Sequence, residues 1–167
     1  MQDEYREAIA HLATAVSIVT TRYDGKPVGM TASAVCSLSL EPVMVLVCIA
    51  SRLPSHDAIS QSGRFAINVL PEGSENLALN FARPSPDKFS GVRLLDDHEV
   101  PVLRDALAYF VCELHERIPG GDHSIFIGRV MRCERRGGGK PLLYFNRKFG
   151  RLDDPEEELL RALAHGL

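Results

Sequence analysis

The sequence lacks paired cysteine motifs, long apolar runs and a strong excess of charge of either sign. Its four cysteines are far apart and show no CxxC or Cys/His ligand spacing, which predicts buried, reduced thiols and no metal site. The longest apolar run, Val43–Ala50, is too short to cross a bilayer, and the charged N-terminus lacks the apolar stretch of a signal peptide. The net charge of −3 does not indicate a nucleic-acid partner. We therefore expect a cytoplasmic protein with neither a membrane nor a nucleic acid as its partner.

A glycine motif for dinucleotide binding is also missing. No GxGxxG follows a strand and opens a helix, so a dinucleotide would not be held in a Rossmann crevice. Short strands with glycine turns, and helices only at intervals, instead predict a mainly β fold with a small antiparallel barrel and a few short helices. The length of 167 residues suits one domain, residues 1–167, with a substantial core.

Periodicity predicts where the helices and strands lie. An apolar stripe through Tyr5, Ile9 and Leu12, with Asp3 as the cap, predicts an N-terminal helix that covers one end of the core. Further helices are expected at residues 55–62, 72–83 and 156–165. Strands are expected as a hairpin that turns at residues 24–26, then at 43–50, 64–70, 108–117, 124–135 and 142–152, the last three as two successive hairpins.

Residues 29–42 form a segment rich in small and hydroxylic side chains, with no charge before Glu41. Small side chains let the backbone come close to a flat ligand, and hydroxyl groups can bond phosphate or ring carbonyls. The hydroxyls in question belong to Thr31, Ser33, Ser37 and Ser39. Such a lining is expected of a flavin site. A hairpin of edge strands whose serines and threonines face water would have the same composition.

Several segments, in the same order and spacing, match one protein family. They are LATAVSIVTT at residues 12–21, GMTASAVCSLSLEPVMVLVCIA at 29–50, FAINVL at 65–70, NFA at 80–82, GDHSIFIGRV at 121–130 and PLLYF at 141–145. Together they resemble the short-chain flavin reductases, the NAD(P)H:flavin oxidoreductases that serve two-component flavin monooxygenases. The resemblance implies a split β-barrel homodimer that binds FMN or FAD near the subunit interface. It also implies NADH or NADPH as the electron donor and a partner monooxygenase that receives the reduced flavin.

The resemblance further implies which residues bind the flavin. Those beside the isoalloxazine ring would be Thr31, Ala32, Ser33 and Ala34. Further cofactor-binding positions, toward the ring edge and the phosphate, would be Val35, Ser37, Ser39, Cys48, Ile49, Ala50, Ser51 and Arg52. Phe81 and Ala82 would flank the ring or the adenosine part. Backbone N–H groups in such segments can donate hydrogen bonds to the flavin edge. The alternative for Arg52 is an arginine at a strand end whose side chain faces only solvent.

His123 is the candidate catalytic residue, because the GDH segment of the family is associated with the nicotinamide side of the site. From the residues alone, a turn histidine that caps a strand is the alternative. The other histidines show no ligand spacing and are expected on solvated faces: His11, His56, His98, His115 and His165. The basic run is interpreted as a solvated strand face rather than a phosphate site, and comprises Arg129, Arg132, Arg135, Arg136 and Lys140.

Hydride transfer from nicotinamide to flavin needs little acid or base help from the protein, so we expect no catalytic triad. Two alternatives to a reductase remain. One is a pyridoxamine-phosphate-oxidase-like FMN enzyme of the same barrel, which would need a basic phosphate pocket for its substrate. The other is a non-catalytic flavin or haem carrier, which would bind its ligand without oxidising NAD(P)H.

Overall fold

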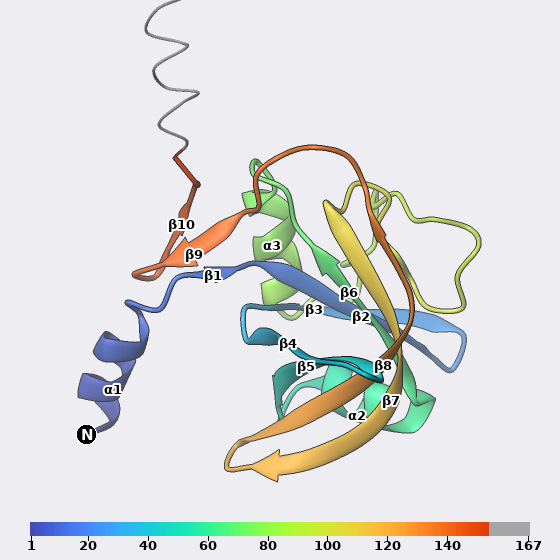
Figure 1. Cartoon of the computed structure of the whole chain (residues 1–167), viewed down its shortest axis with the longest axis horizontal. Helices are drawn as coiled ribbons and strands as arrows, with labels where there is room; N and C mark the ends of the chain where they lie inside the picture. Colours follow the sequence, from blue (N-terminus) through green and yellow to red (C-terminus); the bar gives the residue numbers. More distant parts are fainter. Residues whose placement is uncertain (154–167) are drawn as a thin grey trace, which may run out of the picture.

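Seven strands form one antiparallel sheet in the computed structural model, which describes residues 1–153 (Figure 1). The strands are β2 (Ser17–Tyr23), β3 (Lys26–Ala32), β4 (Val35–Leu40), β5 (Val43–Ala50), β6 (Arg64–Val69), β7 (Ala108–Gly120) and β8 (His123–Arg135). They are hydrogen-bonded in the order β3-β2-β6-β7-β8-β5-β4. The sheet curls, so that β4 and β5 lie across from β2 and β3 rather than in one plane with them.

Within residues 1–153, a smaller sheet and three helices accompany this barrel. The small sheet has the order β1-β9-β10 and consists of β1 (Thr14–Ala15), β9 (Leu143–Phe145) and β10 (Lys148–Gly150). The helices are α1 (Gln2–Ile9), α2 (Pro54–Ser62) and α3 (Glu75–Ala82). In Figure 1, α1 and the small sheet project to one side of the barrel, while α2 and α3 pack on it. No helix within residues 1–153 has the length and apolar character needed to span a membrane.

The large sheet is open. Within residues 1–153, its two edge strands, β3 and β4, pair with other strands but not with each other. These strands follow one another in the chain, and only Ser33 and Ala34 connect them. We call Ser33 and Ala34 the β3–β4 junction. It connects the two edge strands of the sheet. On the outer side of each edge strand, the backbone N–H and C=O groups do not pair with another described strand. The antiparallel split β-barrel with a few short helices that the sequence predicts is confirmed.

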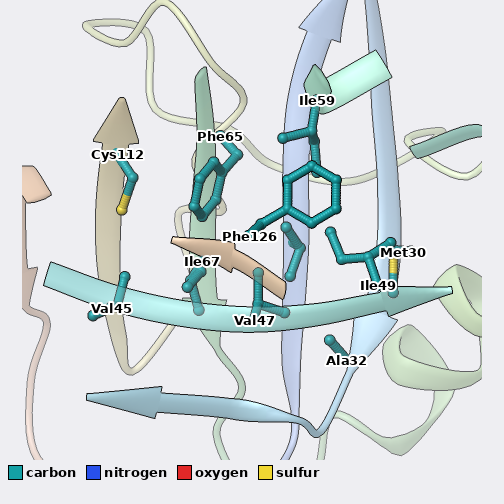
Figure 2. Close-up of a cluster of buried hydrophobic side chains, with 11 residues drawn as sticks. Met30, Ala32, Val45, Val47, Ile49, Ile59, Phe65, Ile67, Cys112 and Phe126 are labelled. Carbon is teal, nitrogen blue, oxygen red and sulfur yellow. The ribbon is translucent and has the colours of Figure 1, made fainter. Parts of the chain in front are cut away.

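Apolar side chains fill the inside of the barrel (Figure 2). Val47 and Ile49 of β5 are fully buried and belong to one cluster with Phe65 of β6 and Phe126 of β8. Ile59 of α2 closes the same cluster. Burial of each such side chain stabilises the fold by about 1.5–3 kcal/mol before entropy is counted. Since the interior is occupied by side chains, a ligand site must lie on the outside of the barrel.

Most of the elements predicted from periodicity are confirmed. The hairpin of β2 and β3 turns at Asp24 and Gly25, and α2 ends at Gly63, whose φ of 67° is the left-handed conformation typical of a helix stop. The helix expected at residues 72–83 is α3, with Ser74 at its N-cap, although the Ser74 side chain makes no capping hydrogen bond. The long hairpin of β7 and β8 is also present.

The prediction for residues 142–152 is wrong. Instead of one strand that forms a hairpin with β8, the segment contains the short hairpin β9–β10, and β9 pairs with β1. Asn146 and Arg147 turn the chain with φ values of 48° and 61°. Asparagine adopts this conformation more readily than most residues but arginine rarely does, so the pair lacks the Asn-Gly pattern typical of such a turn. The helix expected at residues 156–165 lies outside the described residues.

The N-terminal helix is present but does not cover the core, so that part of the prediction is wrong. None of the residues of α1 is buried, and Tyr5 is 64% exposed. The helix ends at Ile9, so Leu12 lies beyond it, and this residue is 63% exposed. The N-cap of α1 is Met1 rather than Asp3, and it makes no side-chain capping hydrogen bond. Its apolar stripe therefore faces away from the barrel interior and remains available for another contact.

The cysteine prediction is confirmed in part. All four cysteines are free thiols. Cys112 is buried and Cys48 is half-buried, but Cys36 and Cys133 are exposed, so the expectation of four buried thiols is wrong for these two. Burial raises the pKa of Cys112 to about 12, which keeps this thiol protonated and unreactive at neutral pH.

Candidate functional site

A hollow of about 910 Å³ opens between α1 and the β3–β4 junction, and we call it the junction hollow. On the barrel side it is lined by Ser33, Ala34, Cys48 and His123. On the other side it is lined by α1, by the segment that follows α1 and by the hairpin β9–β10, through Tyr5, Ile9, Leu12, Tyr144 and Arg147. The structure thus brings together four of the residues predicted to bind the flavin or the nicotinamide, from three separate parts of the chain.

Backbone hydrogen bonds hold these three parts in place. The Cys48 N–H donates to the Ala34 carbonyl at 3.0 Å, which ties the junction to the end of β5. The Ser51 N–H donates to the Asp122 carbonyl at 2.9 Å, which ties the segment after β5 to the turn before β8. The positions of the small residues and of His123 are therefore fixed by the sheet itself rather than by loose loops.

His123 is the first residue of β8 and follows a tight turn at Gly121, whose φ is 67°. Its side chain is 46% exposed, and Nδ1 bonds Oδ1 of Asp122 at 2.7 Å. This hydrogen bond, together with the charge of His123 and more weakly that of Arg52, lowers the pKa of Asp122. Among residues 1–153, no partner binds Nε2 of His123, so this nitrogen is free to contact a ligand.

A second hollow of about 320 Å³ lies on the other side of Ala32, and we call it the α3 hollow. Three predicted site residues line it, namely Thr31, Phe81 and Ala82. Its polar residues include Ser55, Arg83 and Lys88. Thr31 borders this hollow and Ser33 borders the junction hollow, so the two hollows reach the chain only two residues apart.

Lys88 anchors the loop that follows α3. Its Nζ donates to the Gly29 carbonyl at 3.1 Å and to the Phe81 carbonyl at 2.9 Å. Burial lowers the pKa of Lys88, although two carbonyl acceptors surround the ammonium group. The sequence places Lys88 only in a loop, and none of the neighbouring residues predicts that its side chain would bond a carbonyl of β3.

Gly29 shows why a glycine begins the small-residue segment. A Cβ atom here would lie 2.7 Å from Cε1 of Phe81 and 3.1 Å from Cζ of Phe89. The two phenylalanine rings meet edge to face, with their centroids 4.9 Å apart. The absence of a side chain at Gly29 thus lets two aromatic rings of the protein itself approach the β3 backbone.

Other predicted positions lie outside both hollows or have their side chains engaged. Ser37 and Ser39 lie farther along β4, and Ser39 Oγ accepts a hydrogen bond from the Glu41 N–H at 3.2 Å. Thr31 Oγ1 donates to the Ala78 carbonyl at 2.6 Å. The side chain of Ile49 is fully buried in the core, so only its backbone could face a ligand. The remaining positions have surroundings of their own: Ala32 and Ala50 are buried, Val35 packs against the core, and Ser51 and Arg52 are exposed.

Comparisons with known proteins show which family the chain belongs to. Residues 9–153 match the family model described as the flavin reductase like domain. The chain belongs to this family. The family predicted from the sequence motifs is thereby confirmed, and the split barrel is the fold expected of it.

Two named relatives cover most of the chain. One is the 4-nitrophenol 4-monooxygenase/4-nitrocatechol 2-monooxygenase, reductase component, of Rhodococcus opacus. It is 42% identical over 147 residues, which are 88% of this chain and 79% of that protein. The other is the flavin reductase (NADH) of Kitasatospora aureofaciens, 36% identical over 176 residues, with 98% of this chain and 90% of that protein covered.

Solved structures of flavin reductases share the fold. The NADH:FAD oxidoreductase SgcE6 of Streptomyces globisporus C-1027, in complex with NAD and FAD fragments, superposes with a TM-score of 0.87 at 31% identity. This match covers 92% of our chain and 94% of that chain. Flavin reductase PheA2 superposes with a TM-score of 0.84 at 34% identity, covering 92% and 99%. The flavin reductase like family therefore agrees with this chain in both sequence and fold.

Proposed function

We propose that this protein is an NAD(P)H-dependent flavin reductase that reduces FMN or FAD and supplies the reduced flavin to a separate monooxygenase. The observation that carries the proposal is the junction hollow, in which the small-residue junction faces His123 in a member of the flavin reductase like family. Relatives named as reductase components of monooxygenases, and a structural neighbour with NAD and FAD fragments, support the choice of substrates and partner.

The residues present fit a flavin. The hollow of about 910 Å³ lies at the upper end of the roughly 300–1,000 Å³ typical of ligand pockets. Among the described residues, the Ser33 hydroxyl has no hydrogen-bond partner, and the adjoining edges of β3 and β4 offer backbone donors and acceptors. Ala34 adds no bulk that would keep a ring away from the backbone.

A bound flavin would supply the redox chemistry, as the acceptor of a hydride from the reduced nicotinamide. The chain's own residues bind, align and shield the reacting rings. Ser33 and the junction backbone hold the flavin edge, and His123 presents Nε2 to the nicotinamide side. The Asp122 carboxylate fixes the ring of His123 through Nδ1. No proton needs to be moved by a triad, because alignment and exclusion of water supply most of the rate.

We also propose that the protein is a homodimer. The apolar stripe of α1 is exposed beside the junction hollow, and Leu40 and Val43, where β4 turns into β5, are 82% and 47% exposed. A second copy that covers α1 would bury this apolar surface and would close the outer side of the hollow. This arrangement would place the flavin near the subunit interface, as the resemblance implies.

The test is NAD(P)H oxidation by the purified protein with FMN, FAD or riboflavin added in turn, followed by the loss of reduced-nicotinamide absorbance. Flavin-dependent turnover supports a reductase and gives both cofactor preferences. Tight flavin binding without oxidation would instead indicate a carrier.

In the same assay, His123→Ala should raise the KM for NAD(P)H more than the KM for flavin. His115→Ala, at an exposed histidine of β7 outside the hollow, is the matched control.

A further inference from the structure

His56 differs from the other described histidines because it is buried. Its side chain is only 8% exposed, so the expectation of a solvated histidine is wrong at this position. Nε2 bonds Oγ of Ser124 at 3.0 Å, and Nδ1 bonds Oδ1 of Asp57 at 3.0 Å. The ring also meets Phe126 edge to face, with the centroids 5.2 Å apart. One side chain of α2 thus contacts two residues of β8.

The chain Asp57–His56–Ser124 has the connectivity of a nucleophilic triad, but it cannot act as one. Ser124 is only 5% exposed and lies on the side of β8 that faces the barrel interior, so no substrate reaches its hydroxyl. The Asp57 carboxylate can only accept, which places the proton on Nδ1. In the neutral ring Nε2 then accepts from the Ser124 hydroxyl. The network is therefore structural, and its role depends on which part of β8 the hydrogen bond to Ser124 fixes in place.

Alternation along β8 answers that question. Successive residues of a strand point to opposite faces, so Ser124 and Phe126 point inward while their neighbour His123 points outward, into the junction hollow. We propose that His56 is a positioning residue for the nicotinamide side of the site. Its hydrogen bond to Ser124 fixes the register and the orientation of the first residues of β8. The imidazole of His123 is thereby directed into the hollow. This inference rests on the proposed reductase function.

The first experiment removes the hydrogen bond from either end, in His56→Leu and Ser124→Ala. Each substitution should raise the KM for NAD(P)H roughly 3- to 10-fold, the value of about one hydrogen bond, with the dissociation constant for flavin unchanged. In His56→Gln, whose amide can reach Ser124, the KM for NAD(P)H should return most of the way to the wild-type value. An unchanged KM in Ser124→Ala, which keeps the fold with the least disturbance, overturns the proposal.

Thr21→Val is the matched control for lost stability. Thr21 is fully buried and its Oγ1 bonds Oγ of Ser62 at 2.7 Å, at the opposite end of α2 from His56. Thr21 Oγ1 also donates to the Arg64 carbonyl at 2.6 Å, so the substitution removes two part-buried hydrogen bonds at the end of α2 away from His56. It should lower the melting temperature as Ser124→Ala does but leave the KM for NAD(P)H unchanged. An equal rise in KM for both variants would show a general effect of stability and would overturn the proposal.

A double-substitution cycle tests whether the effect passes through His123. In a His123→Ala background, Ser124→Ala should cause no further rise in the KM for NAD(P)H, because the residue that it positions is gone. Full additivity of the two substitutions would show that Ser124 acts elsewhere. This result overturns the positioning role without affecting the reductase function.

A readout independent of turnover separates the two proposals. The Cε1–Hε1 NMR signal of His123, assigned by its loss in His123→Ala, should shift in Ser124→Ala and stay in place in Thr21→Val. If the wild-type protein fails to oxidise NAD(P)H, the reductase function is wrong, and the NMR signal still decides whether His56 and Ser124 orient His123. An unmoved signal in Ser124→Ala overturns the positioning role.

Discussion

Gly128 in the middle of β8 is the position where a single added methyl group should disturb the core most directly. A Cβ atom there would lie 2.5 Å from Cζ of Phe65 and 2.8 Å from Cβ of Cys112, both fully buried. Forcing one extra carbon into a packed core costs about 1–3 kcal/mol, and replacing a strand glycine by alanine returns about 0.5–1 kcal/mol of backbone entropy. We therefore expect Gly128→Ala to lower the free energy of unfolding by about 1–2 kcal/mol.

The measurement is thermal unfolding followed by circular dichroism. For a chain of this size, the loss corresponds to a fall in melting temperature of roughly 2–8 °C. Gly150→Ala in β10 is the control, because nothing lies within 4 Å of the added Cβ, and it should not lower the melting temperature. Phe65→Leu should relieve part of the strain in a double variant. A Gly128→Ala protein as stable as Gly150→Ala would refute the reasoning.

Three further predictions concern the site, the core and the assembly. Arg52→Ala should weaken flavin binding about 3- to 10-fold in a fluorescence titration; an unchanged affinity would leave Arg52 as a solvent-facing arginine. Because the pKa of Cys112 is raised to about 12 from 9.0, the unfolded thiol loses its proton first and stability falls above about pH 9. Urea unfolding at about pH 8 and pH 10 should show a loss near 1 kcal/mol that is absent in Cys112→Ala. Replacing Tyr5 and Leu12 by serine should convert the proposed dimer to a monomer in sedimentation velocity, whereas an unchanged size would exclude α1 from the interface.

The sequence predicted the fold well where the pattern is local. Alternation and glycine turns predicted the hairpin β2–β3, and the small-residue segment contains Ser33 and Ala34, which line the junction hollow. The prediction failed where partners are distant in the chain. The burial of His56 depends on Ser124, which lies 68 residues away, and no local pattern signals it. The return of Lys88 to Gly29 across 59 residues is another such case.

The apolar stripe of α1 shows a different limit. Its periodicity correctly predicted a helix, but periodicity indicates only that one face seeks an apolar partner, not which partner. The barrel interior is already filled by strand residues and by Ile59 of α2, so the stripe has no place in the core of its own chain. A stripe that remains exposed beside a ligand-sized hollow is consistent with an assembly in which the site is completed by a second copy.

Alternation along β8 separates stability from function in a way that can be tested. Gly128 and Ser124 share the inward face, but they lie four residues apart, or roughly 13 Å along an extended strand. Gly128 contacts only the core, whereas Ser124 holds the strand end beside His123. Gly128→Ala should therefore lower the melting temperature and leave the KM for NAD(P)H unchanged, while Ser124→Ala should raise that KM. If both variants raised the KM in proportion to their loss of stability, the site would respond to the core as a whole, and the role of the buried His56–Ser124 pair in orienting His123 would be lost.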